Sequence, residues 1–464
     1  MKTTTLIVLF LSTIVAMAQD RLTANESRFY TNKIPNKEIE IKLSGKNDGG
    51  DSDLLNAKIA SLSKSGGGII HIKKGNYYLI DVVLHSNIHI KIDKDVMIEP
   101  YFDKNAKKVG NNIFEVGKEF LVENVAITNA DEDNENQATW FSANFPKGDY
   151  RMKIITGCNV RNFKFSGFKI TDSYTPFSCI ALNLPDSGDR NEVAFQGIVK
   201  NILLINSHVG YGVIQIQAGK SILCKNLEGV GGVTMRVETG SGETGKENVL
   251  TVDDIVGRNI KIKDGDAAVN VSPHRVDQGR VDVEGIIAVN SSFAVQIAGG
   301  FKDKKETGVD NIGTFDSRSY IGDITVTGGK GAQVKSKDFI YFDCIERKEM
   351  ETKCQNPDFE STPGRSIGVI RTNATLASGC KNGSDGGCYE INIGKITKTN
   401  SDFLMSSNYT YKNMGINGCD KTKVERNADC LKNPSKGKGK KHGETKAKEN
   451  NKEVKKGKKN NKTL

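Results

Sequence analysis

Four short stretches between residues 212 and 298 decide the fold of this 464-residue chain. They read GVIQIQ (212–217), GVTMRVE (232–238), AAVNVS (267–272) and FAVQIA (293–298). Apolar and polar residues alternate in each stretch, so a strand formed there has one apolar face and one polar face. Because the apolar residues recur at every second position, a helical repeat with its spacing of three or four is excluded.

The four stretches form a repeat of irregular length. Aligning Ile216, Val237, Val271 and Ile297 gives intervals of 21, 34 and 26 residues, as in a solenoid whose turns carry loops of different length. A β-sandwich of similar short strands is the alternative fold, but the strands repeat without hairpin-turn signals between them. We therefore predict an all-β protein, a right-handed parallel β-helix.

The sequence also predicts how the β-helix begins and ends. A capping helix over 53–62 places Leu55, Ile59 and Leu62 on one face, with Asp53 as its N-cap. A triple glycine ends this helix, and the first rung of the coil follows it. The expected organisation is a signal peptide (1–18), an N-terminal extension (19–48), the β-helix domain (49–412), a cysteine-pinned segment (413–432) and a disordered lysine-rich tail (433–464).

The first eighteen residues have the pattern of an export signal. Lys2 supplies the positive start, residues 6–11 and 14–15 the apolar core, and the Ala-Met-Ala ending at Ala18 a small-residue cleavage site. No later run reaches the ~18 apolar residues of a membrane span. We therefore expect a secreted protein, extracellular or periplasmic, with no part in a membrane.

The formal net charge of +10 resides in the C-terminal tail. Residues 432–464 hold 13 Lys and 3 Glu, a net charge of +10, so the rest of the chain sums to zero. A general basic surface is excluded, and we expect no nucleic-acid partner. The tail either attracts an anionic surface or polymer, or is a solvated extension without consequence.

The nine cysteines fit an oxidising compartment. Three local disulfides are the simplest connectivity for the six late cysteines, although six cysteines allow 15 pairings. The chain has no C-x-x-C and no H-E-x-x-H motif, so zinc is not expected. The predicted disulfides are Cys344–Cys354, Cys380–Cys388 and Cys419–Cys430, and the predicted buried thiols are Cys158, Cys179 and Cys224.

Polar positions of successive strands converge on one face of the predicted coil. Because Val237 points inward, Arg236 and Glu238 both point outward, which places a guanidinium beside a carboxylate. Cleavage of a glycosidic bond requires a protonated carboxyl beside the leaving oxygen, and Glu238 could supply it. From spacing alone, a surface ion pair is the favoured alternative. The outward polar residues are Gln215, Gln217, Arg236, Glu238, Asn270, Ser272 and His274.

The sequence RVET at 236–239, followed by PH at 273–274, resembles the catalytic strip of the iota-carrageenases, glycoside hydrolase family 82. The resemblance spans roughly residues 50–420. It implies a secreted β-helical enzyme that hydrolyses internal β-1,4 linkages of a sulfated galactan, iota-carrageenan, with inversion. It also implies a general acid at Glu238, a polar residue beside the reaction centre at Gln215, a residue supporting the substrate at His274 and a sulfate or sugar contact at Arg236.

One position departs from the family pattern. The family's typical base is an Asp two residues after the acid, and this chain has Gly240 there. Two residues along a strand span ~6.6–6.8 Å, inside the ~6.5–9.5 Å of an inverting pair, so its loss requires a substitute. Glu243 is the favoured candidate, and Asp264, Asp266 and a water-orienting His274 are the alternatives. Loss of activity is the remaining outcome.

A doubly sulfated galactan should be held by cations with forked hydrogen-bonding geometry. The resemblance implies no cofactor for the chemistry, but bound calcium, sodium and chloride ions. The acidic loop 131–135 could bind calcium, although such a loop is more often simply solvated. We expect a monomer that binds the polysaccharide. The predicted substrate-binding residues are Arg236, Gln217, Asn270, Arg275 and Lys302, with Arg280, Lys304 and Lys305 nearby.

Two other functions fit the same coil. A polysaccharide lyase would need a Lys or Arg base and would release an unsaturated product that absorbs ultraviolet light. A non-catalytic β-helix would bind glycan and keep its affinity after Glu238→Gln. The strip of Arg236, Glu238 and His274 favours hydrolysis over both.

Overall fold

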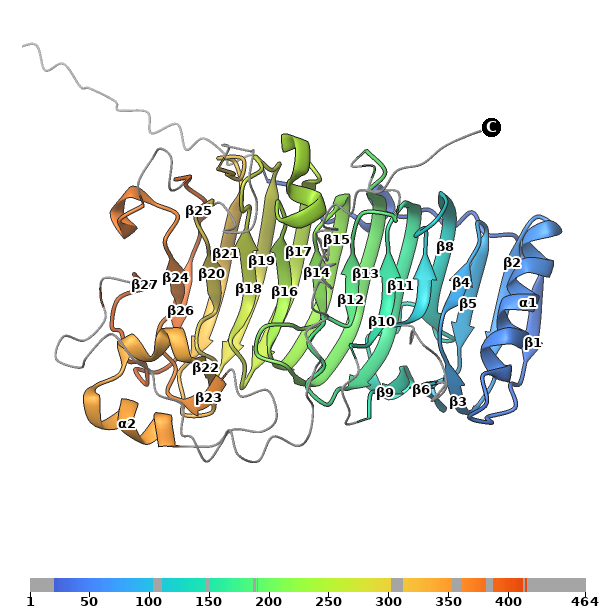
Figure 1. The fold of residues 1–464 in the computed structure, drawn as a ribbon, viewed down its shortest axis with the longest axis horizontal. Coiled ribbons are helices and arrows are strands. Elements are labelled where there is room, and N and C mark those ends of the chain that lie inside the picture. The colour runs from blue at the N-terminus through green and yellow to red at the C-terminus, as the bar shows by residue number, and fades with distance from the viewer. Residues whose placement is uncertain are drawn as a thin grey trace, which may run out of the picture.

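The computed structural model describes residues 21–102, 111–146, 151–186, 189, 191–301, 312–352, 361–380, 387–411 and 414. Its strands form a 15-stranded sheet and a 10-stranded sheet that both follow the long axis of the molecule (Figure 1). From β10 to β21 consecutive strands alternate between the two sheets, and neighbours within each sheet are parallel. This arrangement is a parallel β-helix, so the predicted fold class is confirmed.

The 15-stranded sheet contains the longest strands of the coil. Its members are β1 (Glu38–Ile41), β2 (Gly68–Ile72), β3 (Gly75–Leu79), β5 (Ile88–Ile92), β6 (Val96–Pro100), β8 (Val122–Asn129), β9 (Phe141–Asn144), β11 (Val160–Thr171), β13 (Ala194–Ser207), β15 (Gly219–Gly231), β17 (Val252–Lys263), β19 (Val281–Val289), β21 (Tyr320–Thr327), β25 (Asn392–Ile393) and β26 (Ile396–Lys398).

The 10-stranded sheet is built from shorter strands. Its members are β4 (Val82–Leu84), β7 (Asn112–Val116), β10 (Lys153–Gly157), β12 (Ile180–Leu182), β14 (Ile214–Ile216), β16 (Val233–Glu238), β18 (Ala267–Ser272), β20 (Val295–Ile297), β24 (Ile370–Thr372) and β27 (Tyr409–Thr410). A separate antiparallel pair, β22 (Ala332–Lys335) and β23 (Ser361–Gly364), lies near the C-terminal end of the coil (Figure 1).

The four residues aligned from the sequence occupy one register position. Ile216 pairs with Val237, Val237 with Val271, and Val271 with Ile297. All four are buried and belong to one apolar cluster that runs through the coil. Full burial of a Val or Ile side chain is worth ~1.5–3 kcal/mol, so the repeat is held in register by its own core.

Asparagine ladders fix the corners of the coil. Asparagine tolerates the left-handed conformation that a tight corner needs, and its amide can hydrogen-bond to the asparagine of the next rung. Each member has a φ between 52° and 62°, and neighbours in a ladder are joined by hydrogen bonds of 2.8–3.0 Å. The two ladders are Asn87–Asn124–Asn162 and Asn201–Asn226–Asn259.

The capping helix is present, but its predicted start is wrong. Helix α1 (Gly50–Lys64) covers the N-terminal end of the coil (Figure 1) and buries Leu55, Ile59 and Leu62 as predicted. Its N-cap is Gly49 with φ 86°, and not Asp53. Moreover, β1 already pairs in parallel with β2, so the sheet begins before the first rung expected from the sequence.

The chain before β1 forms a strap, defined as residues 21–37, along the outer face of the 15-stranded sheet. Arg21 donates to the buried Asp282 on β19 at 2.7 and 2.8 Å, whereas Thr31 bonds with Asn162 on β11 at 2.8 Å in both directions. Between them, Phe29 is fully buried in a small apolar cluster with residues of β13, β15 and β17. The strap therefore connects rungs that are not neighbours.

The cysteine predictions are confirmed where the structure describes both partners. Cys380 and Cys388 form a disulfide, and the predicted thiols Cys158, Cys179 and Cys224 are free and buried. Cys344, at the start of helix α2 (Cys344–Thr352), is disulfide-bonded. Its predicted partner lies outside the described residues, as do the expected signal peptide, the lysine-rich tail and several single predicted residues: Cys354, Cys419, Cys430, Lys302, Lys304 and Lys305. In the described part of the chain, no helix combines the length and apolarity that a membrane crossing requires.

Candidate active site

One row of side chains crosses the 10-stranded sheet from β4 to β24 at equal register. Because parallel strands lie side by side, neighbours in such a row are ~4.8 Å apart. We call it the outward row. In order along the coil it contains Val83, Glu115, Thr156, Ala181, Gln215, Arg236, Asn270, Gln296 and Arg371.

A cleft of about 620 Å³ opens over the C-terminal half of the outward row. Arg236, Asn270 and Gln296 contribute to its floor. The 3-10 helix η4 (Ser336–Tyr341) and the end of β22 form one wall. Polar and aromatic side chains dominate the lining, which includes Tyr211, Arg236, Glu238, Asn270, Ser272, His274, Gln296, Phe301, Lys335, Lys337, Asp338, Tyr341, Arg371 and Asn373.

Glu238 lies at the centre of a hydrogen-bonded group in this cleft. Arg236 Nη2 donates to Glu238 Oε2, and Asn270 Nδ2 donates to the same oxygen at 3.5 Å. Arg236 Nη1 also donates to Gln215 Oε1 at 3.4 Å, and the Tyr211 ring lies 5.0 Å from the guanidinium carbon. The side chain of Arg236 is only 10% exposed, so the pair is not the exposed surface ion pair considered as the alternative.

His274 approaches Glu238 from the next rung. It follows the end of β18 with a left-handed φ of 49°, which turns the chain so that Nε2 lies 3.5 Å from Glu238 Oε1. The imidazole packs against the Phe301 ring with a centroid distance of 4.4 Å. The structure thus brings Gln215, Glu238 and His274 to one face of one sheet.

The environment of Glu238 has two opposing effects on its pKa. Burial acts to raise the pKa, but Arg236 and His274 stabilise the carboxylate and hold the pKa well below its ordinary value. Glu238 is therefore ionised in the empty cleft. A proton can reside on this carboxyl only when the positive charge of its neighbours is engaged elsewhere.

Gly240 does not occupy the strand position that the spacing argument assumed. Strand β16 ends at Glu238, and Gly240 follows with φ 77°. A Cβ on this backbone would lie 2.0 Å from the carbonyl oxygen of Pro273. The estimate of ~6.6–6.8 Å along a strand therefore does not apply here, and an Asp does not fit this turn without a shift of the backbone.

Neither of the first two candidate bases lines the cleft. Glu243 lies on the 3-10 helix η3 (Gly242–Asn248), where its side chain is 61% exposed and pairs with Lys246. Asp264 accepts a hydrogen bond from Asn290.

Asp266 is fully buried beneath the cleft wall. It lies 2.7 Å from Lys335 Nζ and accepts from Gln296 Nε2 at 2.9 Å. It therefore positions two residues of the lining.

Three residues predicted at or near the substrate face, Gln217, Arg275 and Arg280, lie outside the cleft lining. The backbone carbonyl of Gln217 accepts the hydroxyls of Thr239 and Thr251, and the side chain of Gln217 is not among the residues of the cleft lining. Arg275 and Arg280 are buried, at 4% and 6% exposure, outside that lining.

Several residues of the cleft were missed by the sequence analysis. Arg371 shares the outward row with Gln296 and donates to it at 3.4 Å, and its Nε lies 3.3 Å from Asp338 Oδ1. The signal for Arg371 was present, because Ile370 and Thr372 flank it in the same alternating pattern. Lys335 and Lys337 reach the cleft from a segment outside the repeat, so the alternating pattern could not predict their position.

The acidic loop 131–135 is occupied by lysines. Asp133 lies 2.7 Å from both Lys164 Nζ and Lys200 Nζ, and these ammonium groups lower the pKa of Asp133 to about 2 although burial opposes the shift. The loop is therefore ion-paired and not simply solvated. Within the described ranges, no three His, Cys, Asp or Glu side chains are grouped so that they could hold a metal ion.

Fold and cleft together define a parallel β-helix protein with a polar, cation-rich cleft across one sheet. The chain is 32% identical to an iota-carrageenase of Zobellia galactanivorans over 318 residues, 66% of this chain and 62% of that protein. It is 30% identical to an iota-carrageenase of Alteromonas macleodii over 264 residues, 56% of this chain and 52% of that protein. The matched region is therefore homologous to the iota-carrageenases, and the chain spans less than two thirds of the length of both relatives.

Solved structures agree on the fold. An iota-carrageenase of glycoside hydrolase family 82 from A. fortis, solved in the absence of chloride ions, superposes with a TM-score of 0.67 at 21% identity, covering 87% of this chain and 98% of that one. An iota-carrageenase complexed to iota-carrageenan fragments gives a TM-score of 0.66 at 22% identity, covering 87% and 99%. No family model matches the chain.

Proposed function

We propose that this protein is a secreted hydrolase that cleaves internal β-1,4 linkages of a sulfated galactan of the iota-carrageenan type. The observation that carries the proposal is the contact of Glu238 with Arg236 and His274 in an open cleft. The region that contains these residues is homologous to proteins named iota-carrageenase, and a similar structure was solved with iota-carrageenan fragments.

The charge of the cleft supports a sulfated substrate. Four cationic side chains line it, Arg236, Lys335, Lys337 and Arg371, against the carboxylates of Glu238 and Asp338. Arginine binds oxyanions through two parallel N–H groups. Among the described residues, the Nε of Arg236 has no hydrogen-bond partner, so this guanidinium retains donor capacity for a ligand.

In the proposed mechanism Glu238 protonates the leaving oxygen. A substrate sulfate that binds Arg236 draws the guanidinium away from Glu238, and burial then raises the pKa of the carboxyl so that it holds a proton. The proton passes to the glycosidic oxygen as the C–O bond breaks, and a water attacks the opposite face of the sugar and releases its own proton to solvent. His274 positions the acid, because its Nε2 lies 3.5 Å from Glu238 Oε1, closer than the ~6.5–9.5 Å that separates the acid from the base in an inverting pair.

The activity is tested with purified protein and iota-, kappa- and lambda-carrageenan. We expect new reducing ends from iota-carrageenan without ultraviolet absorbance from an unsaturated product, because hydrolysis adds water across the bond. An absorbing product would favour the lyase alternative instead. Binding of the polymer without any product would favour the non-catalytic β-helix.

Arg236→Met is expected to shift the pH profile. Without the guanidinium, only His274 still opposes burial and the pKa of Glu238 rises, so the general acid stays protonated to higher pH. The alkaline limb of kcat/KM, which reports this ionisation in the free enzyme, should move to higher pH while KM for the sulfated polymer increases. The matched control, Arg236→Lys, keeps the charge and should raise KM with little shift of that limb. An unchanged limb in Arg236→Met contradicts the proposed role.

A further inference from the structure

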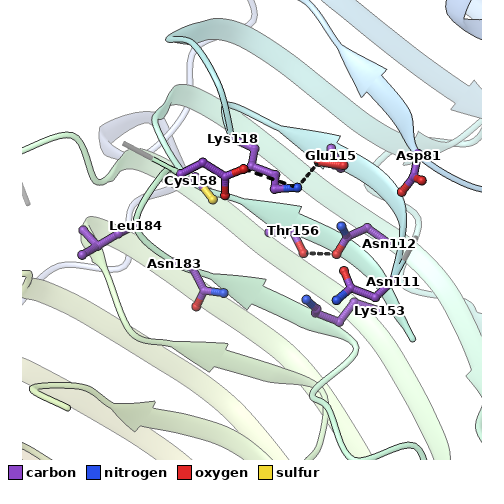
Figure 2. Close-up of a pocket in the computed structure, with 11 residues that line it drawn as sticks. Asp81, Asn111, Asn112, Glu115, Lys118, Lys153, Thr156, Cys158, Asn183 and Leu184 are labelled. Atoms are coloured by element: carbon purple, nitrogen blue, oxygen red, sulfur yellow. Dashed lines mark hydrogen bonds and ion pairs between the residues drawn. The ribbon is translucent and has the colours of Figure 1, made fainter. Parts of the chain in front are cut away.

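A second pocket, of about 340 Å³, lies at the N-terminal half of the outward row. Figure 2 shows it over β7 and β10, with the chain after β12 contributing Asn183. Glu115 and Thr156, two members of the outward row, are part of its lining. It is therefore on the same face of the same sheet as Glu238.

Lys153 places a buried ammonium group in this pocket without a carboxylate partner among the described residues. The residue is 8% exposed, and among the described residues its ammonium has no carboxylate within ion-pair distance. The Nζ atom lies 4.6 Å from the centroid of the Phe177 ring, a cation–π contact. Burial lowers the pKa of Lys153 to about 8. Burying a cation without a partner is costly, so an anionic ligand would stabilise this arrangement.

Polar groups beside Lys153 are available to the same ligand. Thr156 Oγ1 donates to Asn112 Oδ1, which leaves the amide N–H groups of Asn112 as donors. The side chain of Asn183 also lines the pocket, and its amide N–H groups can donate to an anion. Figure 2 shows Lys153 and Asn183 directed toward one another across the pocket. An ammonium and amide N–H groups around one space form a site for an oxyanion.

The acidic side of the pocket is partly neutralised by Lys118. Lys118 Nζ lies 3.3 Å from Glu115 and 3.7 Å from Asp186. Figure 2 shows the Lys118–Glu115 pair on the side of the pocket away from Lys153. One lysine is therefore shared by two carboxylates, and Asp81 also lines the pocket. Lys153 is the cation on the side of the pocket that carries the amides.

The position of the pocket suits a polymer that also reaches Glu238. Thr156 on β10 and Arg236 on β16 are three strand spacings apart in the outward row, roughly 14 Å. The floor between them is formed by Ala181 and Gln215. Ala181 has the smallest side chain of this part of the row, so a chain lying along the sheet can pass over it.

We propose that this pocket is a distal subsite that binds a sulfate ester of the polysaccharide whose cleavage takes place beside Glu238. The inference rests on the proposed function and adds to it a residue, Lys153, and a length requirement. A galactan fragment must extend a few sugar residues beyond the cleft to reach the subsite. Short fragments bind only in the cleft.

The test compares Lys153→Met with the parent protein on sulfated oligosaccharides of increasing length. Loss of one charge-assisted hydrogen bond should raise KM about tenfold for long fragments, with kcat unchanged and with no change for short ones. Asn183→Ala should give a smaller change of the same kind. The matched control, Lys220→Gln, removes a lysine from β15 on the other sheet and should change neither constant. Melting temperatures establish that each variant is folded.

Two further experiments distinguish a sulfate ester of the polymer from inorganic sulfate, and a wrong subsite from a wrong proposed function. Desulfated long fragments should bind the parent and Lys153→Met equally, whereas inorganic sulfate should compete only weakly if the ester on the polymer is the ligand. Equal KM values of parent and Lys153→Met on long sulfated fragments overturn the subsite while hydrolysis stands. If the parent hydrolyses nothing, the proposed function fails, and equilibrium binding of long and short fragments then decides on the subsite alone.

Discussion

Glu238→Gln is expected to lower kcat on iota-carrageenan on the order of 10²–10⁴-fold, the usual contribution of a general acid. The amide keeps the shape of the side chain but has no proton to give to the leaving oxygen. KM should change little, because Arg236 and Asn270 remain in place. Release of reducing ends over a long incubation measures the residual rate.

The matched control is Glu228→Gln on β15, a carboxylate of the other sheet, which should leave the rate unchanged. Glu243→Gln tests whether Glu243, the base favoured from the sequence, takes part in the reaction. If the exposed Glu243 were the base, its variant would lose as much activity as Glu238→Gln. A Glu238→Gln enzyme with a near-normal rate would remove the basis of the proposed mechanism.

Removing the strap up to residue 30 is expected to destabilise the β-helix by ~3–5 kcal/mol. The deletion leaves Asp282, which is fully buried, without Arg21, and breaking one buried ion pair costs about that much. It also uncovers the apolar cluster around Phe29. Arg258, 3.0 Å from Asp282, compensates part of the charge. Chemical denaturation of the full and shortened chains measures the difference.

The effect of the strap should depend on pH in a defined direction. Burial raises the pKa of Asp282, but the bonds from Arg21 and Leu22 N–H and the charge of Arg258 lower it below the ordinary value. A carboxyl with a lowered folded-state pKa adds stability above its unfolded pKa of about 3.9, and this stability is lost as the pH falls through the folded-state value. The difference in the free energy of unfolding between the full and the shortened chain should therefore become smaller at acidic pH.

A single substitution offers a matched comparison for the strap. Arg21→Met removes the partner of a buried carboxylate, whereas Arg318→Met removes a guanidinium that is 65% exposed and pairs with Asp316 on the surface. Exposed pairs contribute only ~0–1 kcal/mol. Equal losses in the two variants would show that Asp282 does not depend on the strap.

The repeat was predictable from the sequence because the alternation of apolar and polar residues within each strand identifies the residues of the core. The alternation that aligned Ile216 with Val237, Val271 and Ile297 is the same alternation that fills the interior. Since side chains of a strand point to opposite faces in turn, fixing the inward set also fixed the outward one. The grouping of Arg236 with Glu238 followed from Val237 alone.

The remaining features depend on geometry that the alternation does not contain. Gly240 lies beyond the end of its strand in a left-handed turn. The distance between positions 238 and 240 that was calculated for an extended strand is therefore wrong. The N-cap at Asp53 failed because a left-handed Gly49 starts the helix earlier. Lys335 and Lys337 reach the cleft from a wall segment outside the repeat, and the strap contacts were invisible because their partners are remote in sequence.

The strap should change how the β-helix unfolds and folds. Coils of this kind usually behave as one-dimensional arrays in which each turn senses only the next, but Arg21 and Asp282 are 261 residues apart in sequence. The first residues that the structure describes cannot dock until β19 has formed, which adds a late, high-contact-order step to folding. In amide hydrogen exchange, turns from β11 to β19 should consequently open as one cooperative unit instead of fraying singly from the C-terminal end.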